Sequence, residues 1–273
     1  MRLGIFAKTF AGAGPSAVLA AAKAAGFDAA QYNMACSGLP SMPDAIPADV
    51  AAAVSRASQD EDVPICAVSG TYNMAHPDPA VRAAGLRRLE VLAAACGGMG
   101  TRLITLCTGT RDPDDQWRHH PDNSSADAWR DMRAEMAKAV AIAERFDLSL
   151  GIEPELANIV DSAAKARRLI DEMASPALAI VLDPANLFER EDLAGQRRIV
   201  AEAIALLADR IVMGHAKDRD ADGAFVAAGS GVLDYPHYMR CLRQAGFGGD
   251  LVAHGLSAEE APGVSAFLRG LPA

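Results

Sequence analysis

The sequence predicts an α/β fold, a single (β/α)8 barrel that extends over residues 1–273. The length of 273 residues fits the ~250 residues that are typical of this fold. Short apolar runs alternate eight times with longer, Ala-rich segments of helical periodicity. No linker or low-complexity tract marks a second domain. Eight consecutive strand–helix units favour a closed parallel barrel over a doubly wound open sheet, which is the alternative.

The apolar runs have the features of strands that are buried on both faces. Each run is short, often contains β-branched residues, and is bounded by Gly, Pro or polar residues. The predicted strands are Leu3–Phe6, Ala29–Tyr32, Ile65–Val68, Leu103–Leu106, Leu148–Ile152, Leu178–Leu182, Ile211–Met213 and Leu251–Ala253.

The segments between these runs are predicted to be helices. Pro15 suits a first helical turn, because its missing N–H would be unpaired there in any case. Asp161 or Ser162 can cap the fifth helix. Gly26 and Gly246 suit left-handed positions just after two helices. The predicted helices cover residues 15–25, 47–60, 79–97, 125–146, 162–173, 193–208, 235–245 and 258–269.

The composition excludes several classes of protein. The net charge of −9 argues against a nucleic-acid partner, which would require a basic face. The apolar runs are shorter than the ~18 residues that a membrane span needs, and the first residues lack a signal-peptide pattern. The five cysteines form no C-x-x-C pair, which favours reduced thiols. We therefore expect a cytoplasmic protein with a small-molecule substrate and no membrane partner.

Ionisable residues end four consecutive predicted strands. These residues are Glu153, Asp183, His215 and His254. Because active sites of such barrels form at the carboxyl ends of the strands, we expect the four side chains to share one rim. Carboxylates and imidazoles with open coordination positions suit a divalent metal such as Mn²⁺, Mg²⁺ or Zn²⁺. The alternative is that each residue separately caps a helix or binds a backbone amide.

Two segments resemble a known family. His215-Ala216-Lys217-Asp218 is similar to an H-x-K-D pattern at strand 7, and Gly229–Tyr235 is similar to a G-x-G-x-hydrophobic-D-aromatic turn. Both resemble the xylose-isomerase-like TIM barrel superfamily, also called sugar phosphate isomerase/epimerases. The resemblance extends over essentially the whole chain, but it does not define the substrate.

The resemblance implies roles for individual residues. Glu153 would be a metal ligand and the proton-transfer base, while Asp183 and His215 would be further ligands. Asn186 occupies a position where many relatives have a histidine that touches the substrate. Glu155 lies where some relatives place a second carboxylate near the substrate.

The chain departs from the epimerase pattern at strand 8. The epimerases have a second glutamate there, which is a ligand and the second acid/base group, whereas this chain has His254. Glu259 and Glu260 are predicted to lie on the last helix, too far along the chain to replace that glutamate. An imidazole can bind a metal or transfer a proton near neutral pH, but it supplies no negative charge.

Further residues near the rim are candidates for substrate contacts. A Trp flanked by cations suits a sugar ring and oxyanions, and the long loops 108–125 and 218–233 could carry such contacts. For Trp117 and His76 a role in loop packing is equally consistent, and His237 is expected to be structural. The remaining substrate-binding candidates are Lys217, Arg219, His76, Trp117 and His120, and Lys8 could also reach the rim.

The function that these features favour is a metal-dependent isomerase or epimerase of a small sugar, keto-sugar or sugar acid. The metal would stabilise an enediolate, with Glu153 as the base and His254 as its partner. A lyase, dehydratase or hydratase with the same metal site is the first alternative, and a noncatalytic sugar-binding barrel is the second. The resemblance also suggests a homo-oligomer, and manganese is one candidate metal.

Overall fold

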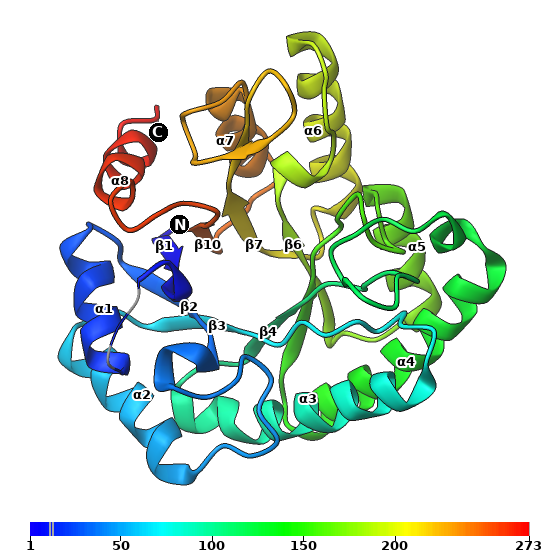
Figure 1. Cartoon of the computed structure of the whole chain (residues 1–273). Helices are drawn as coiled ribbons and strands as arrows, with labels where there is room; N and C mark the ends of the chain where they lie inside the picture. Colours follow the sequence, from blue (N-terminus) through cyan, green and yellow to red (C-terminus); the bar gives the residue numbers. More distant parts are fainter. Residues whose placement is uncertain (11, 13, 273) are drawn as a thin grey trace.

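The structure is a computed structural model that describes residues 1–10, 12 and 14–272, and it contains a closed barrel of eight parallel strands. Around the barrel the order is β1-β10-β7-β6-β5-β4-β3-β2, so the chain closes where β1 pairs with β10. The predicted (β/α)8 fold is therefore confirmed (Figure 1). The barrel strands are β1 (Leu3–Phe6), β2 (Ala29–Tyr32), β3 (Ile65–Ser69), β4 (Leu103–Leu106), β5 (Ser149–Ile152), β6 (Leu178–Leu182), β7 (Ile211–Ala216) and β10 (Asp250–Ala253).

Helices surround the strands on the outside (Figure 1). Their positions agree closely with the predicted ranges, and several of them have a recognisable start or stop signal. Ser162 caps α5 by accepting the N–H of Lys165, and Gly26 and Gly246 have φ angles of 89° and 73°. The helices are α1 (Pro15–Ala24), α2 (Ala48–Asp60), α3 (Pro79–Met99), α4 (Ala126–Arg145), α5 (Ala163–Met173), α6 (Leu193–Leu207), α7 (Tyr235–Gln244) and α8 (Ala261–Arg269).

The last helix begins later than predicted. Residues 258–260 form a turn in which Glu260 accepts the N–H of Ser257 at 2.8 Å, and α8 begins at Ala261. The placement of Glu259 and Glu260 on the helix was therefore wrong. The local hydrogen bond to Ser257 stabilises a separate turn before the helix.

Strand β7 is longer than predicted, and the extension carries His215. The strand continues to Ala216, and the hydroxyl of Tyr238 on α7 lies 3.2 Å from the carbonyl oxygens of both Leu182 and His215. This close approach depends on Gly214, where a Cβ atom would lie only 2.8 Å from the Tyr238 hydroxyl oxygen. Helix α7 thus holds the ends of β6 and β7 in a defined position.

The segment after β7 folds into a small hairpin rather than an open loop. Strands β8 (Asp218–Arg219) and β9 (Phe225–Val226) pair antiparallel. The buried Asp218 carboxylate then accepts the N–H groups of Gly229, Gly231 and Leu233 at 2.9–3.2 Å. Gly229 has a φ of 86°, a left-handed conformation that glycine adopts without strain. The Gly-rich motif therefore folds around an aspartate of its own chain.

The remaining global features concern thiols and hydropathy. All five cysteines are free. Within the described ranges, no helix combines the length and the hydropathy that a bilayer crossing requires.

Candidate metal centre

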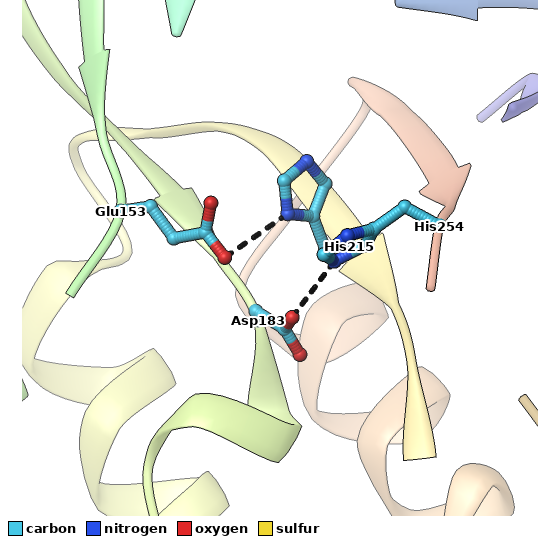
Figure 2. Close-up of side chains that lie close together, drawn as sticks. All are labelled: Glu153, Asp183, His215 and His254. Atoms are coloured by element: carbon cyan, nitrogen blue, oxygen red, sulfur yellow. Dashed lines mark hydrogen bonds and ion pairs between the residues drawn. The ribbon is translucent and has the colours of Figure 1, made fainter. Parts of the chain in front are cut away.

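Four ionisable side chains converge at the carboxyl end of the barrel. Glu153 follows β5, Asp183 follows β6, His215 lies on β7 and His254 follows β10. One ligand atom of each residue lies within 4.8 Å of those of the other three (Figure 2). The strands β5, β6, β7 and β10 are consecutive in the barrel, so the rim brings together residues that are distant in the sequence.

The donor set fits a divalent cation. His215 Nδ1 is buried and has no hydrogen-bond partner within the described part of the chain. It lies 3.2 Å from Glu153 Oε1, but this contact lacks hydrogen-bond geometry. A buried nitrogen without a partner is costly, and a bound cation would satisfy it. Two carboxylates and two imidazoles are ligands that Zn²⁺ and Mn²⁺ accept.

Both carboxylates are held in the ionised form. Burial alone would raise the pKa of Asp183, but Lys217 and the hydrogen bond from His254 outweigh it and lower the pKa below its ordinary value. For Glu153 the raising effect of burial is outweighed by His215, and its pKa is also lowered. Ionised oxygens are the form that binds a metal ion.

Asn186 and Lys217 connect the two carboxylates. The Asn186 amide donates to Glu153 Oε1 at 2.7 Å and accepts from the Lys217 ammonium at 3.0 Å. The same ammonium lies 3.2 Å from Asp183 Oδ2. Burial lowers the pKa of Lys217, but Asp183 and Glu153 outweigh this effect and raise it, so the side chain stays cationic. The structure thus brings both predicted residues into the cluster.

His254 contacts the cluster through Asp183. Its Nε2 lies 2.9 Å from Asp183 Oδ2, and its ring centroid is 4.2 Å from that of His215. Burial and the neighbouring His215 lower the pKa of His254, although the hydrogen bond to Asp183 acts in the opposite direction. In this arrangement Nε2 carries a hydrogen that it donates to the carboxylate, so this nitrogen would have to release the hydrogen before it could bind a metal.

Glu153, His215 and His254 of the cluster line a cavity of about 370 Å³, whereas Asp183 is fully buried. The rest of the lining consists mainly of uncharged polar side chains. The Lys8 ammonium also lines the cavity. The sequence does carry a signal for some of them, because Gln31 and Thr105 interrupt otherwise apolar strands. That signal was not used in the sequence prediction. The missed lining residues include Gln31, Asn33, Ser41, Ser69, Thr71, Thr105 and Gln116.

Glu155 lines the same cavity, two residues beyond Glu153. Burial, together with the nearby charge of Glu153, raises the pKa of Glu155 to about 7. The Lys217 ammonium opposes this shift. The site therefore contains one carboxyl group that exchanges its proton near neutral pH.

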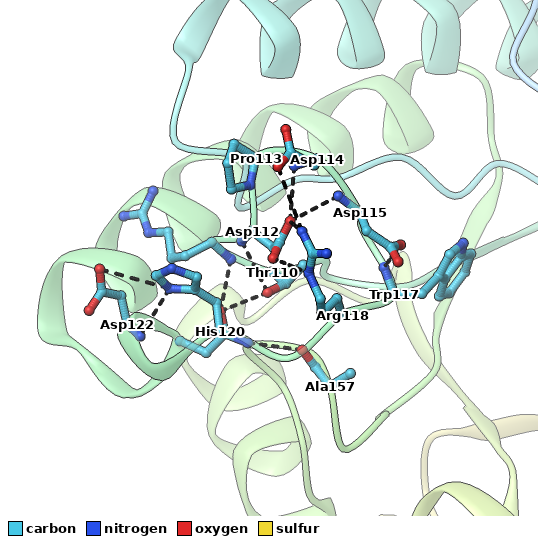
Figure 3. Close-up of polar contacts among 12 residues, drawn as sticks. Thr110, Asp112, Pro113, Asp114, Asp115, Trp117, Arg118, His120, Asp122 and Ala157 are labelled. Carbon is cyan, nitrogen blue, oxygen red and sulfur yellow. Dashed lines mark hydrogen bonds and ion pairs between the residues drawn. The ribbon is translucent and has the colours of Figure 1, made fainter. Parts of the chain in front are cut away.

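The loop between β4 and α4 has its own internal support (Figure 3). The Asp112 carboxylate accepts the N–H groups of Asp114 and Asp115, each at 2.9 Å, and forms a two-point ion pair with Arg118 at 2.5 and 2.7 Å. Trp117 points away from these contacts, is 49% exposed, and lines the cavity. A firmly held loop thus presents an exposed indole to the cavity.

Three residues that were predicted to contact the substrate do not line the cavity: His76, His120 and Arg219. His76 lies 3.0 Å from the carbonyl oxygen of Pro113 through one ring nitrogen and accepts the N–H of Asp78 through the other. His120 accepts the N–H of Asp122 in the same loop. Both ring nitrogens of His76 and the Nδ1 of His120 are thus engaged in loop contacts, and neither residue lines the cavity.

Arg219 also has its donors engaged within the protein. Its Nε donates to the carbonyl of Ala185 at 2.6 Å, and its guanidinium lies 4.0 Å from the centre of the Phe225 ring. Arg219 is buried and lies outside the cavity lining. These contacts hold the β8–β9 hairpin against the segment after β6. His237, expected to be structural, lies 2.9 Å from the Arg197 carbonyl oxygen.

The fold and the cluster together place the chain among closed (β/α)8 barrels with a candidate metal site at the carboxyl ends of the strands. Residues 19–262 match the model of the family described as "Xylose isomerase-like TIM barrel". The chain belongs to this family, and the resemblance inferred from the sequence motifs is confirmed. A comparison with curated proteins finds no match.

Several solved structures share the fold along their whole length. The chain is similar to 3-keto-D-glucoside 4-epimerase from E. coli, with 19% identity, a TM-score of 0.77, and coverage of 98% of this chain and 99% of that one. A D-tagatose 3-epimerase-like protein has 13% identity, a TM-score of 0.77 and coverage of 98% and 96%. The probable 3-DHS dehydratase AsbF from Bacillus anthracis has 13% identity, a TM-score of 0.76 and coverage of 99% of both chains. At these identities the likeness concerns the fold.

Proposed function

We propose that this protein is a divalent-metal-dependent isomerase or epimerase of a small sugar, keto-sugar or sugar acid. The observation that carries the proposal is the convergence of Glu153, Asp183, His215 and His254, three of which, all but the fully buried Asp183, line one cavity. Membership of the family and the likeness to two sugar-epimerase folds support it. The cavity volume of about 370 Å³ lies within the ~300–1,000 Å³ range of small-molecule sites.

Glu153, Asp183 and His215 would hold the cation, with His254 as a fourth ligand or as its neighbour. When bound, a divalent cation acts as a Lewis acid that stabilises negative charge on the carbonyl and hydroxyl oxygens of a substrate. Carboxylate and imidazole ligands suit Mn²⁺, Mg²⁺ and Zn²⁺. We propose manganese as the natural metal, with the other two ions as alternatives. Metal analysis of the purified protein tests this choice.

Glu153 and His254 are the proposed proton-transfer groups. The Glu153 carboxylate would take the proton from the carbon next to the substrate carbonyl. The electron pair of that C–H bond would form a C=C bond while the π pair of the C=O bond moves onto the carbonyl oxygen, which gives an enediolate. His254, after taking up a proton from solvent, would return it to carbon as the C=O bond reforms. Asn186 already donates to Glu153 Oε1 at 2.7 Å, which orients the carboxylate for this transfer.

Other lining residues would bind the rest of the substrate. Lys217 is buried and cationic, and it would contact a developing oxyanion. Glu155 would accept or donate a hydrogen bond to a substrate hydroxyl, and Trp117 would pack against the carbon face of a sugar. Arg219, His76 and His120 remain predictions without support from the cavity geometry.

Deuterium exchange tests this function. The protein is incubated in D2O with Mn²⁺ and a panel of ketoses, keto-sugars and sugar acids. An isomerase or epimerase incorporates deuterium at the carbon that loses its proton and yields an isomer of equal mass apart from the label. A complete lack of exchange and of product across the panel, with Mn²⁺ bound, would favour a noncatalytic sugar-binding barrel.

A lyase or dehydratase is the second candidate, and His254 is the observation that favours it. Elimination needs one base and one acid rather than two matched carboxylates, and Glu153 with His254 meets this requirement. The fold also resembles that of a probable dehydratase. A product that has lost water, detected by mass spectrometry, would identify this chemistry.

Three broader assignments complete the proposal. We propose that residues 1–273 form one domain, because the barrel pairs its first strand with its last. We also propose a cytoplasmic location, supported by five free cysteines, and a homo-oligomer, supported by the resemblance alone. Limited proteolysis, cell fractionation and light scattering test these assignments in turn.

A further inference from the structure

A buried line of hydrogen bonds crosses the interior of the barrel and ends at His215 of the metal centre. Gln31 on β2 donates from Nε2 to Thr105 Oγ1 on β4 at 3.0 Å. Its Oε1 lies 3.0 Å from His215 Nε2 on β7. All three side chains are buried, and Gln31 and His215 are 184 positions apart in the sequence. The two residues therefore meet only because the sheet closes into a barrel.

The direction of these hydrogen bonds has a consequence for His215. An amide oxygen accepts hydrogen bonds and cannot donate them, so the contact with Gln31 Oε1 requires a hydrogen on His215 Nε2. In the neutral ring, Nδ1 then carries the lone pair. Nδ1 is the nitrogen that faces Glu153 and has no hydrogen-bond partner in the described residues.

We propose that Gln31 is a positioning residue, which selects the tautomer of His215 that offers the Nδ1 lone pair to the metal. Thr105 supports this role, because its hydroxyl accepts from the amide nitrogen and leaves the amide oxygen facing His215. The inference rests on the proposed metal site, and it deepens the proposed function by assigning a role to two uncharged side chains on the opposite half of the barrel.

The alternative is that Gln31 only fills space in the barrel. A reversed amide would present its nitrogen to His215 Nε2, which would then need the lone pair. The hydrogen would move to Nδ1, and this nitrogen, which faces Glu153, would have no lone pair to offer to a metal. The two tautomers therefore make opposite statements about metal binding.

Replacement of the amide by an apolar chain of similar length tests the proposal. Gln31→Met removes the acceptor, while Gln31→Glu keeps an acceptor and lets the Thr105 hydroxyl donate to the second oxygen. Gln196→Met is the matched control, because Gln196 is also a buried glutamine but lies on α6, outside the metal centre. Full-length proteins freed of metal are titrated with Co²⁺, and the Kd and the visible absorption spectrum are recorded together with the melting temperature.

We expect Gln31→Met to weaken Co²⁺ binding by about 10- to 100-fold, the usual effect of removing a group that orients a metal ligand. The Co²⁺ spectrum should change, whereas Gln31→Glu should bind at least as tightly as wild type. Gln196→Met should keep the wild-type Kd and spectrum. A wild-type Kd and spectrum in Gln31→Met, even with a lower melting temperature, would overturn the proposal.

Nitrogen NMR separates this inference from the proposed metal site. The ¹⁵N shifts of His215 in the metal-free protein report which ring nitrogen carries the hydrogen. We expect the hydrogen on Nε2 in wild type and a shift toward the other tautomer in Gln31→Met. A hydrogen on Nδ1 in wild type overturns the inference. If wild type fails to bind Co²⁺, Mn²⁺ or Zn²⁺ but keeps the Nε2 hydrogen, the proposed function fails while the tautomer assignment stands.

Discussion

The two halves of the barrel rim differ in chemistry. On the half formed by β5, β6, β7 and β10, the cavity wall contains carboxylates, imidazoles and the Lys217 ammonium. On the half formed by β1 to β4, the wall is mostly amides and hydroxyls, such as Gln31, Ser69 and Thr105. Lys8 is the charged residue of this second half within the described cavity lining.

This difference has a physical reason. Charges that share one small volume stabilise one another when they have opposite signs, as in the pair of Asp183 with Lys217, and His254 adds a hydrogen bond to the same carboxylate. Uncharged side chains can face substrate hydroxyls without a comparable desolvation penalty. The charged half is therefore suited to proton transfer and metal binding, and the neutral half is suited to binding and to orienting the charged one, as proposed for Gln31.

The largest expected effect comes from the loss of a negative charge on the charged half. Asp183→Asn keeps the volume of the side chain but removes the charge that Lys217 and His254 share. We expect Mn²⁺ affinity to fall by at least about 100-fold, since a ligand counts for more than a group that only orients one. Metal content and isothermal titration measure this loss.

Glu135→Gln is the matched control for that variant. Glu135 is a buried carboxylate on α4, where it pairs with Lys138 away from the rim. The Glu135→Gln variant should keep wild-type metal content. Equal Mn²⁺ binding by wild type and Asp183→Asn would mean that the charged half binds no metal.

Two substitutions test the role of His254 in the charged half. Its replacement by Gln preserves a hydrogen-bond donor to Asp183 but removes the proton carrier, so turnover should fall by about 100-fold or more. His254→Glu should strengthen Mn²⁺ binding by at least about 10-fold, because it adds a negative charge beside the cation. Steady-state kinetics and metal titration check both variants. Unchanged turnover and affinity in both would make His254 structural.

The two tryptophans of the chain provide a comparison of binding with packing. Trp117 faces the cavity and is 49% exposed, whereas Trp129 on α4 is 8% exposed, donates to Glu172 and stacks against Arg168. Trp117→Ala should raise KM by about 10-fold with little change in stability.

Trp129→Ala should behave in the opposite way. It should destabilise the fold by about 3–5 kcal/mol, because it opens a cavity under α4. KM should then change little at temperatures where the variant stays folded. A loss of stability with unchanged KM in Trp117→Ala would assign this side chain to loop packing. Kinetics and thermal denaturation distinguish these outcomes.

Glu155 lies after β5, at the boundary between the halves, and gives the smallest expected effect. The native state raises its pKa to about 7, above the value of 4.5 for the free side chain. The protonated form is thus favoured by folding, so this contribution is complete below pH 4.5 and is lost as the pH rises through about 7. In metal-free protein, Glu155→Gln should gain stability over wild type at pH 8.5, by at most about 3 kcal/mol before solvent screening.

The difference should disappear at low pH. At pH 4 the glutamic acid is protonated in the folded state and mostly protonated in the unfolded state, so wild type and Glu155→Gln should unfold at similar urea concentrations. Urea denaturation at the two pH values measures this. An equal stability difference at both would show that the carboxyl group does not titrate between them.

Much of the architecture is determined by the sequence alone. The strands and helices were predicted within a few residues, because buried parallel strands are continuous apolar runs and helices have a separate period with its own caps. The clustering of the four residues was also predictable, because they end four consecutive apolar runs and active sites of such barrels form at the carboxyl ends of the strands. The family motifs at His215 and Gly229 supported the same conclusion.

The tertiary structure decided the contacts between distant segments. Sequence patterns did not reveal that Gln31 reaches His215 across the barrel, because the two meet only after β1 and β10 close the sheet. They also did not separate the cavity-facing Trp117 from His76, His120 and Arg219, which form contacts within the fold and lie outside the cavity lining. Local periodicity specifies which face of an element is buried, whereas the partner of each polar side chain depends on long-range packing.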